Sequence, residues 1–291
     1  MLQQQPGARS QLQQSCPMCG GHELYVHFTY DEQPPLETRF PLAAGSRYWR
    51  ELHRCAQCGH YLEYFEPDQN ALYGEEYVSA TYGDADGLRR MFERIDALPA
   101  QRSDNTGRVR HVLDYCAQHW PTERFADRKP TLLDVGAGLG VFPYRMQQAG
   151  WDCTALDLDP RQVQHLREVA GVRAELGDLN SQSGLGRFDL ISFNKVLEHI
   201  REPIGVLAGS AQKLLPGGLV YVELPDAEAA EREGKEREEY LLGHIHVFSF
   251  ASFALLIAHA GLQLLDCQRL QEPSSKYTLR GFACVPQEAN G

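Results

Sequence analysis

The stretch Leu132-Leu133-Asp134-Val135-Gly136-Ala137-Gly138-Leu139-Gly140 decides the fold of this chain of 291 residues. Its apolar half predicts a buried strand, and its three glycines predict a turn that leads into a helix. A turn without side chains lets backbone N–H groups approach a ligand closely. A nicotinamide dinucleotide fingerprint would require glycine at position 141, which is Val141, and the P-loop pattern G-x-x-x-x-G-K-[ST] is absent from the sequence. The stretch therefore predicts a nucleoside-binding turn of another type.

Apolar runs recur around this turn and are separated by helix-like or loop segments. The runs are 132–135, 153–156, 190–193 and 219–222. Strands that alternate with helices form a mainly parallel sheet with helices on both faces. A final helix can be capped by Ser249 and can end at Gly261. The sequence therefore predicts an α/β fold with a Rossmann-like sheet over residues 129–291.

Acidic residues follow the second and third predicted strands. Asp157 comes about 20 residues after the glycines, at the position where a carboxylate accepts hydrogen bonds from both ribose hydroxyls. Asp159 is more suited to capping the next helix. Asp178 follows a short third strand and can meet the amino group of an adenine. Each acid taken singly is also compatible with a helix cap or a solvated turn, so the prediction depends on the set.

Composition narrows the function classes. The chain has 28 Lys and Arg against 39 Asp and Glu, for a formal net charge of −11, which disfavours nucleic acid and anionic membranes as partners. The most apolar stretch, 248–265, is interrupted by polar residues and falls short of a membrane span. The first residues carry no signal-peptide pattern. We therefore expect a cytoplasmic protein in a reducing environment.

Four of the eight cysteines form two Cys-x-x-Cys pairs, each followed by glycine. Two such knuckles supply the four thiolates of a tetrahedral Zn²⁺ site and leave no open coordination position, so the role would be structural. Two disulfides or four unligated thiols are the alternatives. The four remaining cysteines are expected to pack in the core. The predicted ligands are Cys16, Cys19, Cys55 and Cys58.

The chain divides into parts of different character. Residues 1–15 are rich in Gln and read as a disordered tail, and residues 16–66 form the zinc-binding module. Residues 67–128 are predicted to form a helical connector or cap, with an amphipathic helix over 108–119. The charged run 227–240 contains opposite charges at i, i+4 and is interpreted as a solvated helix.

The quoted segments, with 188–200 and 214–223, resemble the five successive motifs of the class I S-adenosylmethionine-dependent methyltransferases, in order and at ordinary spacing. The resemblance covers roughly residues 108–270 and implies their Rossmann-like sheet, with S-adenosylmethionine (SAM) as cofactor. It implies that Gly136, Gly138 and Gly140 face the methionine moiety and that Asp134 supports their loop. It likewise implies that Asp157 holds the ribose, Asp178 the adenine amine, and that Asn194 lines the cofactor pocket.

Methyl transfer to an acceptor other than a free amine requires a base with a pKa near neutrality, which favours histidine. His199 follows the fourth strand and His244 precedes the last helix, both at the carboxyl edge of the sheet. A zinc-binding segment before such a domain resembles bacterial methyltransferases that act on nucleotide-linked sugars and other small precursors. That resemblance implies His244 as general base and Glu223 as a pocket residue. Unlike the sugar C-methyltransferases, the chain lacks their additional C-terminal domain and has Gly243 before this histidine.

Three functions follow from these patterns. The first is SAM-dependent methyl transfer to a small-molecule, nucleotide-sugar or glycan-precursor acceptor. The second is an RNA methyltransferase with a zinc module, which is disfavoured because residues 16–66 contain seven acidic residues against four arginines. The third is a non-catalytic SAM-binding scaffold whose zinc module recruits a partner.

Overall fold

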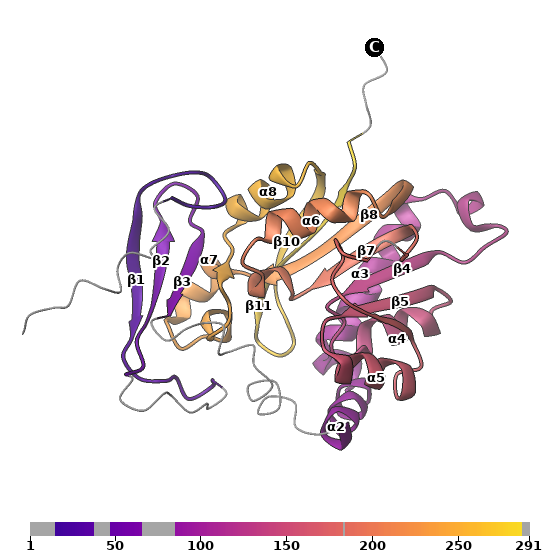
Figure 1. Cartoon of the computed structure of the whole chain (residues 1–291), viewed down its shortest axis with the longest axis horizontal. Coiled ribbons are helices and arrows are strands. Elements are labelled where there is room, and N and C mark those ends of the chain that lie inside the picture. The colour runs from indigo at the N-terminus through magenta and orange to yellow at the C-terminus, as the bar shows by residue number, and fades with distance from the viewer. Residues whose placement is uncertain (1–14, 38–46, 66–84, 183, 287–291) are drawn as a thin grey trace, which may run out of the picture.

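The computed structural model describes residues 15–37, 47–65, 85–182 and 184–286. Two sheets organise these residues, a small one near the N-terminus and a larger one with helices on both faces (Figure 1). The predicted tail falls almost wholly outside the described residues, as does the first part of the predicted connector. No helix within the described ranges is both long and apolar enough to cross a membrane.

The larger sheet has seven strands in the order β10-β11-β8-β7-β4-β5-β6. The five neighbouring strands β8, β7, β4, β5 and β6 are parallel to one another. Strand β11 is antiparallel to both of its neighbours, β10 and β8. The chain moves outward from β4 through β5 to β6 and then returns to β7 on the other side of β4. Ligands of such sheets bind at this switch point, beyond the carboxyl ends of the strands. The strands are β4 Thr131–Val135, β5 Asp152–Asp157, β6 Arg173–Leu176, β7 Phe188–Asn194, β8 Leu214–Pro225, β10 Gln263–Gln271 and β11 Tyr277–Cys284.

Helices cover both faces of this sheet, because alternate residues of each strand point to opposite faces. Leu132 packs in a core with helices α2 to α5, while its neighbour Leu133 packs in a second core with α6 and α8. The α-helices are α2 Ala85–Asp96, α3 Asp104–His119, α4 Val141–Gln148, α5 Pro160–Glu168, α6 Pro203–Ala211, α7 Ala227–Ala230 and α8 Phe250–His259. The 3₁₀ turns are η3 Ala100–Arg102, η4 Thr122–Phe125, η5 Leu197–His199, η6 Glu231–Glu233 and η7 Glu238–Tyr240.

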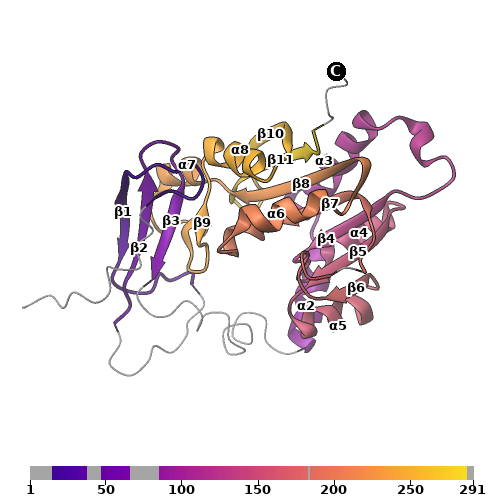
Figure 2. The ribbon, with the colours of Figure 1, turned by 45° about the horizontal axis from the view of Figure 1, so that its top comes forward.

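The smaller sheet is antiparallel, with the order β1-β2-β3-β9. Three of its strands come from the N-terminal region: β1 Leu24–Tyr30, β2 Arg50–Cys55 and β3 Tyr61–Phe65. The fourth, β9 His246–Val247, comes from the segment just before α8 and pairs with β3 (Figure 2). The predicted module 16–66 is thus completed by two residues from the other end of the chain.

The predicted strands of the larger sheet are present, and the amphipathic helix predicted over 108–119 is the main part of α3. The interpretation of 227–240 as a solvated helix is wrong. The run breaks into α7, η6 and η7, and Tyr240 is buried in a core shared with β1 to β3. Of the two i, i+4 pairs, Glu233–Arg237 forms at 2.8 Å, whereas Glu231 contacts His27 and Lys235 donates to the Thr29 carbonyl.

The third glycine of the turn is required by both conformation and space. Gly140 has φ +73°, and a Cβ atom there would overlap Leu166, whereas a Cβ at Gly138 would meet no atom within 4 Å. We expect Gly140→Ala to lower the free energy of unfolding by about 2–4 kcal/mol and Gly138→Ala by only about 1 kcal/mol, since both are strained but only the first overlaps. Urea unfolding without cofactor measures both variants, and equal losses would contradict this explanation.

Candidate active site

The glycine turn is held between the ends of two neighbouring strands. The Gly136 and Ala137 amides donate to the Leu156 carbonyl at 2.7 and 3.3 Å, which ties the turn to β5. On the other side, a Cβ at Gly136 would lie 2.8 Å from the Val196 side chain. The turn is therefore packed between the ends of β5 and β7 at Gly136. At Gly138 the backbone is open, because a Cβ atom there would meet no atom within 4 Å.

Asp157 ends β5 and faces this turn. Its Oδ2 accepts the Gly138 amide at 2.9 Å, and its Oδ1 accepts the Asp159 amide at 3.0 Å. Burial raises the pKa of Asp157 above its usual value, while the two amides act in the opposite direction. Asp159 itself caps α5, as its position suggested, by accepting the Arg161 amide at 2.9 Å.

Asp134 joins β4 to β7 beneath the turn. Its buried carboxylate accepts the Ser192 hydroxyl at 2.6 Å and the Asn194 amide nitrogen at 2.7 Å. Burial raises the pKa of Asp134 to about 7. The Asn194 side chain is thereby fixed, and its Oδ1 is buried without a hydrogen-bond partner among the described residues.

Asp178 lies at the same edge, beyond β6, but is exposed. Its Oδ1 accepts the amides of Asn180 and Ser181 at 2.9 and 3.0 Å, so the carboxylate caps a turn. The Ser181 hydroxyl, followed by the two amides, lowers the pKa of Asp178 by hydrogen bonding. The Gly177 amide donates to the Asp157 carbonyl at 2.9 Å, which brings the Asp178 turn next to the end of β5.

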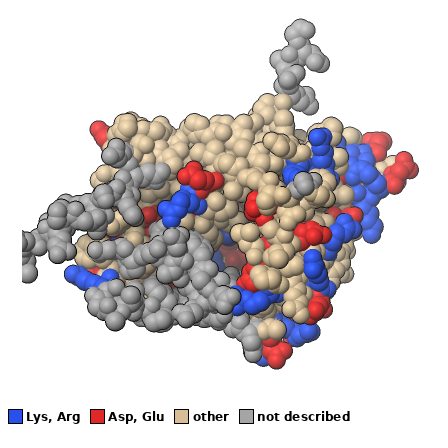
Figure 3. Space-filling view, in the orientation of Figure 1, with Lys and Arg blue, Asp and Glu red and all other residues tan. Residues whose placement is uncertain are grey.

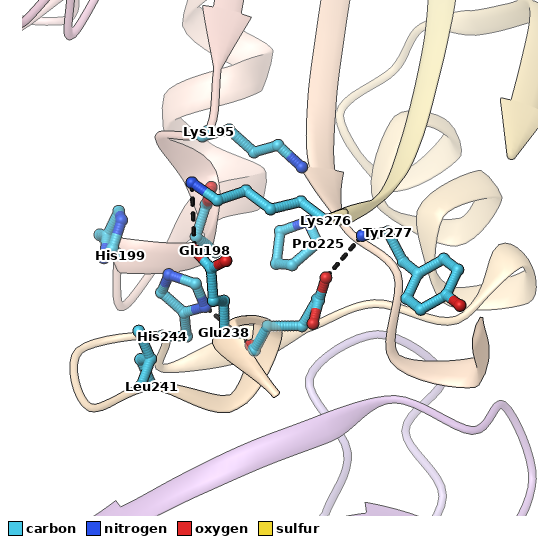
Figure 4. A pocket seen from close by; sticks show the side chains of 10 residues that line it. Lys195, Glu198, His199, Pro225, Glu238, Leu241, His244, Lys276 and Tyr277 are labelled. Atoms are coloured by element: carbon cyan, nitrogen blue, oxygen red, sulfur yellow. Dashed lines mark hydrogen bonds and ion pairs between the residues drawn. The ribbon is translucent and has the colours of Figure 1, made fainter. Parts of the chain in front are cut away.

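A pocket opens at the carboxyl ends of β7 and β8, where Lys195 and Pro225 lie (Figure 4). His199 and His244 lie together at one end of it, with ring centroids 4.9 Å apart. The atoms of Glu198, His199 and His244 that can act as ligands lie within 4.8 Å of one another. The lining residues are Lys195, Glu198, His199, Pro225, Glu238, Glu239, Leu241, His244, Lys276 and Tyr277.

Backbone carbonyls fix the tautomers of both histidines. His199 Nδ1 donates to the Gly243 carbonyl at 2.8 Å, and His244 Nδ1 donates to the Glu239 carbonyl at 2.7 Å. A carbonyl only accepts, so each Nδ1 carries the proton and each Nε2 is the basic nitrogen. Burial, with the neighbouring His199, lowers the pKa of His244 well below its usual value. The His244 ring is therefore neutral at pH 7, and its pKa lies below the near-neutral value expected of the base from the sequence.

Glu223 is placed differently from the expectation that it lines the pocket. Its buried carboxylate accepts Arg108 Nε at 2.7 Å and the Tyr221 hydroxyl at 2.5 Å, and the Arg108 charge helps to lower its pKa. It is not among the lining residues of the pocket. The structure thus places Glu223 in an ion pair between β8 and α3, and the sequence contained no signal for this Arg108 partner.

Lys195 is a pocket residue that the sequence reasoning missed. It is one of two non-glycine residues with positive φ in the described ranges, at +59°, and its Nζ donates to Thr278 Oγ1 at 2.7 Å. Burial lowers the pKa of its ammonium group. Its position directly after Asn194, at the end of an apolar strand, was the available signal. Left-handed backbone at a non-glycine residue is strained and is concentrated at functional sites.

The four predicted zinc ligands converge. Cys16 Sγ lies 3.5 Å from Cys58 Sγ, Cys19 Sγ lies 3.5 Å from Cys55 Sγ, and all four sulfurs are within 4.8 Å of one another. Zn–S bonds of about 2.3 Å in a tetrahedron place sulfurs about 3.8 Å apart, whereas a disulfide requires about 2.05 Å. The donor set and its spacing therefore fit Zn²⁺ and differ from two disulfides.

The cysteine knuckles dock on helix α8. The Ser249 hydroxyl, at the N-cap of α8, donates to the Cys58 carbonyl, and His259 Nε2, in its last turn, donates to the Met18 carbonyl at 2.9 Å. Both ends of the helix that follows the His244 segment therefore contact the N-terminal module.

Comparisons with known proteins agree with this geometry. Residues 86–266, more than half of the chain, match the family model of a methyltransferase domain. The chain is 30% identical over 189 residues to a ubiquinone biosynthesis O-methyltransferase of Xanthomonas axonopodis pv. citri (strain 306), covering 59% of this chain and 79% of that protein. It is 33% identical over 161 residues to a protein of the same name from Serratia proteamaculans (strain 568), covering 53% and 60%.

Solved structures show the same fold at low sequence identity. The magnesium protoporphyrin IX methyltransferase of Synechocystis PCC 6803 superimposes with a TM-score of 0.53 at 14% identity, covering 73% of this chain and all of that one. A glycopeptide N-methyltransferase superimposes with a TM-score of 0.50 at 16% identity, covering 62% and 90%. With the glycine turn and the acids at the switch point, these findings identify the chain as a member of the class I SAM-dependent methyltransferases.

Proposed function

We propose that this enzyme transfers the methyl group of SAM to a small-molecule, nucleotide-sugar or glycan-precursor acceptor, with His244 as general base. The observation that carries the proposal is that the glycine turn and the pocket with His244 are connected by two consecutive residues at the end of β7. Asn194 contacts Asp134 beneath the glycine turn, and the next residue, Lys195, lines the pocket that contains His244. A cofactor over the turn and an acceptor in the pocket would therefore lie side by side.

The residues at the turn fit SAM. Space in front of Gly138 admits a ligand against the backbone, the Asp157 carboxylate is the proposed ribose acceptor, and Asn194 Oδ1 offers a buried acceptor without a donor. When bound, SAM supplies a methyl group already activated on a sulfonium. The protein then has to align the acceptor and, where the acceptor is a hydroxyl, remove its proton. Asp178 is proposed to meet the adenine amine from the neighbouring turn.

His244 is suited to remove that proton because its tautomer and charge are set in advance. Its Nδ1 proton is held by the Glu239 carbonyl, so Nε2 is the nitrogen that accepts. His199, oriented by the Gly243 carbonyl, is proposed to assist the acceptor beside it. The relatives named O-methyltransferases favour a hydroxyl acceptor. We infer no direct contact between the acceptor and Glu223, which is held by Arg108.

We further propose that the four cysteines hold one structural Zn²⁺. All four positions of the metal would be filled by thiolates, which leaves none for substrate. Cysteines that are not paired in disulfides are typical of reducing compartments, which supports a cytoplasmic location. Lys and Arg are interspersed with Asp and Glu on the face shown in Figure 3. The formal net charge of −11 supports a small-molecule acceptor over an RNA.

Asp157→Ala is expected to weaken SAM binding by about 100-fold, since two hydrogen bonds from ribose hydroxyls to a carboxylate are together worth roughly 3 kcal/mol. Isothermal titration calorimetry with SAM and with its product, S-adenosylhomocysteine, measures the Kd. Asp159→Ala is the matched control, because this acid lies two residues away and caps α5. If the Asp157→Ala Kd equals that of the wild type, the ribose role is wrong.

The proposed reaction is tested by incubating the enzyme with methyl-labelled SAM and fractionated metabolite extract. We expect label in a small molecule, and mass analysis of that product gives the methylated atom. Label in RNA instead would support the RNA methyltransferase alternative. SAM binding without transfer to any fraction would support a scaffold and overturn the proposed activity.

A further inference from the structure

The loop that carries His244 is held by the N-terminal module. Three backbone groups between residues 240 and 243 form hydrogen bonds with side chains from outside the larger sheet. The Tyr240 carbonyl accepts Arg50 Nη1 at 2.5 Å, the Leu242 amide donates to Glu37, and the Gly243 amide donates to Glu63. The loop therefore owes its conformation to residues nearly 200 positions earlier in the chain.

The three side chains form a buried ionic triad, Glu37–Arg50–Glu63. Arg50 lies between the two glutamates, with Nη2 2.8 Å from Glu37 Oε1 and Nη1 3.0 Å from Glu63 Oε1. The side chains are 0%, 2% and 0% exposed for Arg50, Glu37 and Glu63, and the Tyr30 ring covers the guanidinium at 4.0 Å. The Tyr48 hydroxyl donates to Glu37 Oε2 at 2.8 Å.

The triad presents directed acceptors to the loop. Glu37 Oε1 accepts the Leu242 amide at 3.0 Å, and Glu63 Oε2 accepts the Gly243 amide at 3.3 Å. Gly243 has φ +93°, a conformation that L side chains rarely adopt. The Glu63 backbone adds a further tie, because its amide donates to the Ile245 carbonyl at 2.9 Å. The segment before β9 is thus bound at both its amides and its carbonyls.

This loop backbone in turn orients both histidines. The Gly243 carbonyl accepts His199 Nδ1, and the loop places His244 so that its Nδ1 reaches the Glu239 carbonyl. A shift of Gly243 would therefore move one hydrogen-bond partner of His199 and the main chain of His244 together. Misplacing a reacting group by about 1 Å can cost on the order of 100-fold in rate.

Stability alone does not account for burying an arginine and two glutamates here, where burial raises the pKa of Glu63 to about 7. The desolvation of buried ions offsets most of their attraction, so a buried salt bridge contributes less than well-packed apolar residues of similar size. Directed ionic hydrogen bonds do, however, select a single backbone arrangement. The triad satisfies loop groups that apolar side chains would leave unpaired.

We propose that the Glu37–Arg50–Glu63 triad is a positioning group for methyl transfer, through which the zinc-bearing module sets the orientation of His199 and His244. The proposal rests on the proposed function, since it assigns these two histidines to the acceptor side. The N-terminal module thereby acts on the reaction without its glutamates touching substrate.

The test compares Glu63→Gln with the wild type. The glutamine keeps the size of the side chain but loses its charge beside Arg50. With an acceptor found by the labelled-SAM screen, we expect kcat to fall about 10- to 100-fold while the KM for SAM is unchanged. Glu51→Gln is the matched control, because Glu51 lies on the same strand as Arg50 and pairs with His53 instead of the loop. Thermal melting and zinc content establish that each variant is folded.

A second readout does not need the acceptor. Nitrogen-15 NMR of histidine-labelled protein distinguishes protonated from unprotonated ring nitrogens, and the His244 signals are assigned by their loss in His244→Gln. We expect the Nδ1–H tautomer in the wild type and in Glu51→Gln, and an altered tautomer or a mixture in Glu63→Gln. If Glu63→Gln does not fold, Glu63→Asp keeps the charge but withdraws it from the Gly243 amide.

Unchanged kcat and unchanged His244 signals in a folded Glu63 variant would overturn the positioning role. Wild-type protein that transfers no methyl group but shows the expected NMR change would overturn the proposed function and leave the structural link intact. A parallel fall in kcat for Glu51→Gln would point to general damage of the sheet and would also overturn the proposal.

Discussion

His244→Ala is expected to lower kcat by about 100- to 10,000-fold while SAM binding is unchanged, which is the usual contribution of a positioned general base. The ring lines the proposed acceptor pocket and contacts none of the glycines of the turn, so its removal should spare the proposed cofactor site. Initial rates with the identified acceptor and calorimetry with SAM measure the two effects. His119→Ala, an exposed histidine at the end of α3, is the control.

The role of His244 as general base also predicts how kcat changes with pH. A base acts in its neutral form, and burial lowers the pKa of His244 well below 6.5. The rate should therefore stay on its plateau through pH 6.5 and fall only at lower pH, as the ring becomes protonated. A rate that already declined from pH 8 to pH 7 would be inconsistent with this residue as the base.

Cys19→Ser is expected to abolish binding of one equivalent of zinc and to lower the unfolding temperature by on the order of 10 °C. Structural zinc contributes on the order of 10 kcal/mol to the folding of small domains, and losing a few kcal/mol of it shifts melting by this amount. Cys19 is the least buried of the four clustered cysteines, so its replacement removes a proposed ligand with little loss of packing. Metal analysis and calorimetric melting provide the measurements.

Cys267→Ser is the control for this prediction, because Cys267 is half-buried and lies outside the cluster. Methyl transfer should fall along with zinc in Cys19→Ser, since the knuckles contact both ends of α8 through Met18 and Cys58. Zinc content and melting equal to those of the wild type would show that the four sulfurs gather without holding a metal.

The strands of the larger sheet could be predicted where a short apolar run in the sequence marks each of them. The runs around Leu133 and Ile191 are apolar because both faces of the strand are covered, and length alone separates them from helices. The antiparallel hairpin of β10 and β11 was not predicted, because the strand 263–271 mixes polar and apolar residues without a clear period. The run 227–240 was misinterpreted because its partners, such as Thr29 for Lys235, are about 200 residues away.

In the candidate site, too, some features could be predicted from short motifs and others depend on distant residues. The cysteine cluster and the turn around Gly138 follow from short motifs, whose spacing dictates their geometry. The surroundings of Glu223 could not be predicted, since Arg108 reaches it from another element. Nor could the bonds of Gly243, whose amide meets a glutamate 180 positions earlier. Charge and residue type indicate that a side chain is functional, whereas its partners depend on tertiary packing.

Strand β9 limits how this enzyme can be recombined with its relatives. Two residues, His246 and Val247, complete a sheet that otherwise belongs to the first 65 positions. A chimera with one crossover between Phe65 and Ala85 would join a foreign amino-terminal unit to a native edge segment that evolved against a different neighbour. A chimera that also exchanges residues 237–249 would keep the N-terminal module together with the β9 segment that completes its sheet. The two distant segments therefore have to be exchanged together.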